Sequence, residues 1–242
     1  MSIDSHHIRI SDIPIEVVRK PIKNLHLAVY PPDGRVRVAV PDHVSDDNVR
    51  LAVISRLGWI KKQQADFAAQ PRQSERCYVS GETHYVWGRR YILEVHWRHG
   101  RHELFIKNNK VLDLYVRPGT STENRALVVN EWYRGALKAQ VPGLLEKWMP
   151  KVGKAPPTWG VKKMRTKWGT CNADSGRIWL NLELAKKSPE CIEYILLHEL
   201  IHLHERHHND RFRAHLDRLM PQWRLYRDKL KSEPLAHEDW SY

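Results

Sequence analysis

The chain has 242 residues, enough for one large domain or two small ones with a sizeable core. Forty Lys and Arg residues against 28 Asp and Glu residues give a net charge of +12, which favours polyanionic partners such as nucleic acids, nucleotides, anionic membranes or acidic proteins. A solvated basic surface without such a partner is the simpler alternative. Three scattered cysteines exclude a disulfide framework, and no apolar run is long enough to span a membrane. The N-terminus lacks the pattern of a signal peptide, so we expect a soluble, cytoplasmic protein.

Residues 1–117 are predicted to form a β-rich module with one helix. Residues 25–40 alternate in polarity on both sides of a Pro-Pro-Asp-Gly turn, which predicts a hairpin. Ser45 is predicted to cap a helix that carries apolar residues at three- and four-residue spacing. We expect an antiparallel meander of about five or six strands packed against this helix. The further strand-like segments are residues 85–87, 91–95, 103–106 and 111–116.

Pro118-Gly119 marks the predicted boundary to a second module, residues 118–242. Its first helix is predicted to kink or split at Pro142-Gly143, and its last helix to break at Pro221. The predicted fold class is α+β: an antiparallel β-rich module with a helix, followed by an α+β catalytic half. The elements expected in this half are a helix over 122–148, strands over 158–164 and 177–181 around a loop over 168–175, a helix from 188 to 203 and a helix over 210–230.

The helix after residue 188 contains the motif H-E-x-x-H. Residues four apart lie one turn above each other, so His198 and His202 point the same way and can bind one Zn²⁺. Glu199 lies about 100° around the helix, within reach of water that the metal acidifies, which is hydrolase chemistry. Apolar residues surround this helix and predict that it is buried, where imidazoles and carboxylates are costly unless paired or bound to metal. Core histidines with ordinary hydrogen bonds are the structural alternative.

A catalytic zinc site needs a third protein ligand besides water. His208 follows His202 by six residues, beyond a break in the helix, where the chain can fold back under the metal. His207 is the neighbouring alternative, and Asp217 on the next helix is a weaker one. His204 points away from the pair and is expected to be solvated or to support a ligand.

Five motifs occur in order along the second half of the chain: M-R-T-K-W-G-T-C from residue 164, G-R-I-W-L-N from 176, H-E-L-I-H-L from 198, H-N-D-R-F from 208 and P-Q-W from 221. Together they resemble the YgjP-like metallopeptidase family, which is distantly similar to the SprT-like and WLM DNA-repair proteases. The family pattern W-G-S-C has Thr170 in place of Ser here, and H-S-P is replaced after His208 by Asn-Asp. The resemblance implies a zincin-type catalytic domain, with His198, His202 and His208 as zinc ligands and Glu199 as the catalytic acid and base.

In zincin folds an edge strand borders the cleft, and the resemblance places Arg165 and Lys167 near it. There they are candidates to bind an acidic or phosphorylated substrate by charge-assisted hydrogen bonds, although two solvated strand charges are equally consistent. Asn181 is expected to cap a loop, and Tyr194 to pack in the core rather than to stabilise an oxyanion.

Three functions from different classes follow. The first is a zinc-dependent metallopeptidase acting on a peptide or protein. The second is a metal-dependent hydrolase of nucleotide phosphoanhydrides, such as a nucleoside triphosphate pyrophosphatase, with Arg165 and Lys167 steadying the phosphates. The third is a DNA-associated protein whose N-terminal module contacts nucleic acid through its basic surface.

Overall fold

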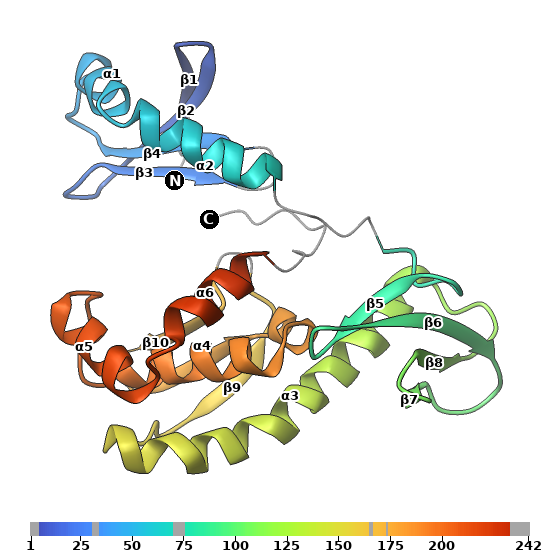
Figure 1. Ribbon diagram of the computed structural model, residues 1–242. Coiled ribbons are helices and arrows are strands. Elements are labelled where there is room, and N and C mark those ends of the chain that lie inside the picture. Colours follow the sequence, from blue (N-terminus) through green and yellow to red (C-terminus); the bar gives the residue numbers. More distant parts are fainter. Residues whose placement is uncertain (1–4, 31–33, 70–75, 165–166, 173, 233–242) are drawn as a thin grey trace. The chain divides into compact units, whose positions relative to one another are not determined.

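The computed structural model describes residues 5–30, 34–69, 76–164, 167–172 and 174–232 (Figure 1). The chain divides into two compact units, with the boundary between residues 71 and 72. The predicted α+β fold class is confirmed, because strands come first and a largely helical half follows. Within the described ranges, no helix combines the length and apolar character that crossing a bilayer requires.

The first unit is a four-stranded sheet covered by two helices. Period-two alternation turns the valines and isoleucines of the strands inward, where Val49, Val53 and Ile60 of the helices complete the core. The hairpin predicted over 25–40 and the helix capped by Ser45 are both present. The elements are β1 (Ser5–Ile10), β2 (Ile13–Lys20), β3 (His26–Tyr30), β4 (Arg35–Pro41), α1 (Asp46–Ile54) and α2 (Leu57–Ala69), with the strands in the order β1-β2-β4-β3.

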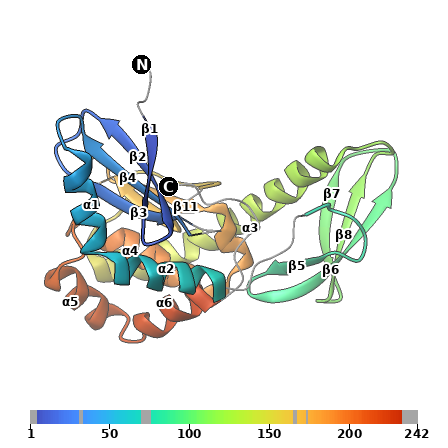
Figure 2. The same cartoon turned by 90° about the horizontal axis from the view of Figure 1, so that it is seen from above.

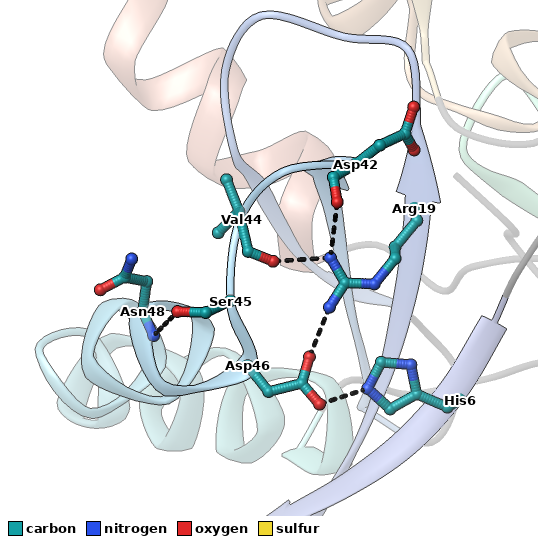
Figure 3. Close-up of polar contacts among 7 residues, drawn as sticks. All are labelled: His6, Arg19, Asp42, Val44, Ser45, Asp46 and Asn48. Carbon is teal, nitrogen blue, oxygen red and sulfur yellow. Dashed lines mark hydrogen bonds and ion pairs between the residues drawn. The ribbon is translucent and has the colours of Figure 1, made fainter.

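A polar network fixes the start of α1 on the sheet (Figure 3). The Arg19 guanidinium donates to the carbonyl of Val44 at 2.6 Å and to the carboxylate of Asp46 at 2.7 Å. The other oxygen of Asp46 lies 2.9 Å from Nε2 of His6 on β1. Asp46 stands in the first turn of α1, where the helix dipole favours a negative charge. Strands β1 and β2 therefore both bind to the same helix end.

The second unit opens with another four-stranded sheet. Its strands are β5 (Thr83–Val86), β6 (Arg89–Trp97), β7 (Glu103–Lys107) and β8 (Val111–Val116), in the order β5-β6-β8-β7. This arrangement differs from the predicted antiparallel meander in two respects. The strands form two separate sheets, and each sheet contains one parallel pair, β2 with β4 and β6 with β8. A hairpin is specified locally by its turn, whereas the partner of its outer edge is selected by tertiary packing.

Helix α3 (Thr122–Val152) connects this sheet to the rest of the second unit (Figures 1 and 2). It continues through Pro142, so the predicted split does not occur, and it ends at Gly153, which adopts φ +78° as a left-handed cap. A stripe of side chains at four-residue spacing, including Val129, Tyr133 and Leu137, packs into the same core as the β5–β8 sheet. The predicted module boundary at 117/118 therefore lies inside one compact unit.

The remaining elements surround the H-E-x-x-H helix. The two predicted strands are present and pair in parallel, and the predicted break at Pro221 separates the last two helices. Part of the predicted loop over 168–175 is a third strand, β10, at the edge of this sheet. The elements are β9 (Trp159–Lys162), β10 (Gly169–Asn172), β11 (Arg177–Asn181), the 3₁₀ turn η1 (Leu182–Lys186), α4 (Pro189–Ile201), α5 (Asp210–Leu219) and α6 (Trp223–Ser232), with the sheet order β10-β11-β9.

Candidate metal centre

Helix α4 is the buried centre of the second unit. It begins at Pro189 after Ser188, as predicted, although the Ser188 hydroxyl lies 3.2 Å from Sγ of Cys191 and makes no side-chain cap. The helix is apolar on nearly all sides, and its leucines and isoleucines are fully or almost fully buried. It ends at Ile201, two residues before the predicted end, and His202 is its C-cap residue. The chain can therefore turn back directly after the second histidine.

Three imidazoles converge at this end of α4. The ring centroids of His198, His202 and His208 lie 4.8–4.9 Å apart, and Nε2 of His198 is 2.9 Å from Nε2 of His208. Helix α5 starts directly behind them, capped by Asn209, whose side chain accepts a hydrogen bond from the N–H of Phe212 at 3.0 Å. The Phe212 ring lies 4.7–4.8 Å from all three imidazoles and forms the apolar floor of the cluster.

The electrostatics of the cluster keep its imidazoles neutral. Burial, followed by the neighbouring charges of His202 and His208, lowers the pKa of His198 to about 3. Burial also lowers the pKa of His202 and that of His208. A neutral imidazole offers a lone pair, so at neutral pH three lone pairs gather in a small volume. A cation is the natural partner for such a group.

The donor set fits a zinc ion. Nδ1 of His202 lies 3.0 Å from the carbonyl oxygen of Glu205, to which only a protonated nitrogen can donate, so Nε2 is left free as a ligand. Among the described residues, Nδ1 of His198 is buried without a hydrogen-bond partner. Three histidines plus one open position match the usual catalytic zinc site. His198, His202 and His208 are the residues that would hold the ion.

Glu199 lies beside the cluster on the inner side of α4. Its side chain is 4% exposed, and it lies directly against Gly169 of β10. Burial raises the pKa of Glu199 to about 8, against the opposing effects of Lys167 and of the Cys171 N–H. A carboxyl group with this pKa can take up and release a proton near neutral pH.

The buried carboxyl group predicts a pH-dependent stability of the metal-free protein. The ordinary pKa of Glu199 is 4.5, and in the folded protein it is about 8, so the fold retains a proton that the unfolded chain has lost. Stability therefore falls as the pH rises through this interval. We expect Glu199→Gln to match the wild type below about pH 4 and to be more stable above about pH 8, by up to about 5 kcal/mol, in urea unfolding of the zinc-free proteins. A difference that does not change with pH would contradict the burial of an ionisable group.

The cluster and Glu199 face an open cleft of about 660 Å³. Its walls include the edge strand β10, exposed Lys167 and Arg206 after α4. Lys167 thus lies at the cleft as predicted, whereas Arg165 lies outside the described residues. Phe212 and Arg206 were not predicted as site residues. The sequence signal for Phe212 is its place in the first turn of a helix that begins directly after the third histidine.

The alternative ligands are engaged elsewhere or lie outside the cluster. Nε2 of His204 lies 2.8 Å from the carbonyl of Val152, and Asp217 accepts hydrogen bonds from Trp223 and Arg224. His207 is exposed and does not belong to the group of convergent ligands.

Two other predicted residues have structural roles. Asn181 is fully buried and donates to the carbonyl of Lys167 at 2.8 Å, so it caps the loop as expected. Tyr194 is 5% exposed and stacks on Trp223, which is core packing.

A second group of metal-ligating side chains lies on the β5–β8 sheet. Glu94, His96 and Asp113 bring their ligand atoms within 4.8 Å of one another. Nε2 of His96 is already 2.7 Å from Asp113, and the Lys107 ammonium lies 3.6 Å from the other oxygen of Asp113. Because the buried carboxylate has a cation and a hydrogen bond beside it, this group does not need a metal ion.

Comparison with known proteins identifies a related family. The family model described as "YgjP-like, metallopeptidase domain" matches residues 23–233, which include all three converging histidines and Glu199. A crystal structure of the metallopeptidase zymogen of Pyrococcus abyssi abylysin is similar over 38% of this chain and 91% of that chain, at 23% identity and a TM-score of 0.36. No curated protein sequence matches the chain.

Proposed function

Because the chain belongs to the YgjP-like metallopeptidase family, we propose that it is a zinc-dependent peptidase with His198, His202 and His208 as the zinc ligands. When bound there, zinc would supply Lewis acidity toward a peptide carbonyl and would acidify water. We assign Glu199 as the general base that takes a proton from this water and then gives it to the leaving amine.

The observation that carries the proposal is the convergence of three neutral imidazoles beside a buried carboxyl group at an open cleft. Burial of Glu199 without a cation is costly, and a divalent ion at the imidazoles would favour its charged form, which is the form that accepts a proton. A cation bound by the histidines would therefore also stabilise the charged form of the neighbouring carboxyl group. A structural zinc would use four protein ligands and leave no role for Glu199.

The cleft also suggests how substrate is bound. Exposed Lys167 is the proposed contact for an acidic group of the substrate, and Arg165 remains a proposal from the sequence. Strand β10 lines the cleft, and among the described strands it pairs with β11 alone. An extended peptide is the substrate class that such a wall accommodates.

Removal of the metal tests the proposal. We expect about one zinc ion per chain, loss of peptide hydrolysis to the detection limit after treatment with a chelator, and recovery when zinc is added back. Zinc content is measured by atomic absorption and hydrolysis on a library of quenched peptides. Nucleoside triphosphates are assayed in parallel for release of diphosphate. Chelator-sensitive hydrolysis of nucleotides without peptide cleavage would overturn the peptidase proposal in favour of phosphoanhydride chemistry.

A further inference from the structure

Gly169, the first residue of edge strand β10, lies directly against the side chain of Glu199. A Cβ atom built on the Gly169 backbone would lie 2.6 Å from Oε1 of Glu199 and 2.7 Å from its Cγ. Carbon atoms in non-bonded contact prefer about 3.5–4.0 Å. No side chain fits at position 169 while Glu199 keeps its position. The overlap reaches Cγ, so a rotation of the carboxylate alone would not relieve it.

We propose that Gly169 is a positioning residue for Glu199. The absence of a side chain at Gly169 leaves the space that the Glu199 side chain occupies against β10. A short edge strand thereby sets the position of a group that belongs to a helix. This inference rests on the proposed role of Glu199 as the general base.

Gly169→Ala tests this proposal. We expect kcat to fall about 10²-fold, because displacement of a catalytic group by about 1 Å has an effect of this size, while KM changes less than about twofold. Bound zinc stays at the wild-type level, since the three histidines are not displaced. A merely structural glycine would lower the amount of folded enzyme and leave kcat per zinc unchanged.

A double-mutant cycle with Glu199→Ala tests the pairing of the two positions. Alanine at position 199 removes Cγ and the carboxyl group, which are the atoms that the new methyl group would meet. We expect Gly169→Ala to reduce kcat about 10²-fold in the wild-type background and to change the residual activity less than about threefold in the Glu199→Ala background. Gly160→Ala on β9 is the matched control, because its Cβ would overlap the ring of Trp179 instead. Its effect is expected to be the same in both backgrounds.

Thermal melting of the same four zinc-free proteins provides a readout that does not depend on catalysis. Overpacking predicts that Gly169→Ala lowers Tm by about 5 °C in the wild-type background and by less than about 2 °C with Glu199→Ala. If the wild type cleaves no peptide, the proposed function fails, and the melting cycle still decides this inference. If the wild type is active but Gly169→Ala has the same effect in both backgrounds, or no effect, the inference is overturned and the proposed function stands.

Discussion

Glu199→Gln is expected to reduce peptide hydrolysis by about 10³-fold while one zinc ion stays bound per chain. Glutamine has nearly the same shape, but its amide cannot take up a proton near neutral pH. The loss therefore reports proton transfer alone. General acid–base catalysis contributes about 10²–10⁴-fold, which sets the expected size. The measurement is kcat/KM on a cleaved peptide, together with zinc content and a melting curve.

Glu190→Gln is the matched control for this substitution. Glu190 lies in the first turn of the same helix and pairs with Lys229, far along α4 from the imidazoles. We expect its activity to remain within about twofold of the wild type, because surface substitutions change stability by only about 0.5 kcal/mol. If zinc-loaded Glu199→Gln kept more than a tenth of the wild-type rate, Glu199 would not be the base.

His208→Ala is expected to lower zinc affinity by more than about 10²-fold and to abolish hydrolysis. Loss of a residue that merely supports a ligand costs about 10–100-fold, and a ligand itself contributes more. His208 faces His198 directly, with the two Nε2 atoms 2.9 Å apart. Competition with a coloured zinc chelator measures the affinity, and the peptide assay measures the turnover.

His207→Ala is the control next to it in the chain. His207 is exposed and lies outside the convergent group, so this variant is expected to keep zinc and activity. The two variants together decide whether His207 or His208 is the third ligand, which the spacing of the histidines alone does not decide. Equal loss in both variants would indicate that the whole turn after α4 binds the ion or depends on it. The reverse pattern would make His207 the third ligand.

The sequence predicted the arrangement on α4 because the periodicity of a helix fixes its geometry. His198 and His202 lie one turn apart wherever α4 is placed, and the apolar residues around them already required burial. The family predicted from the motifs is confirmed by the match over residues 23–233. Predicting the position of His208 required one further assumption, namely that the chain turns directly after α4. Asn209 ends this turn by capping the start of α5.

The sheets were harder to predict because strand pairing is a long-range property. Local alternation located the hairpins, yet it contains no information about which hairpins pair, so the parallel contacts of β2 with β4 and β6 with β8 were missed. Strand β10 was read as loop because Gly169-Thr-Cys-Asn172 has no strand-like pattern over only four residues. Its conformation comes from pairing with β11 and from contact with α4.

The shared core of the β5–β8 sheet and α3 has a consequence for how this chain can be divided. Leu93 and Leu114 of the sheet belong to the same apolar cluster as Tyr133 of α3 and Leu197 of α4. A cut or a fusion at 117/118 would expose both halves of one apolar interior to water. A folded fragment that carries α4 therefore has to include the β5–β8 strands.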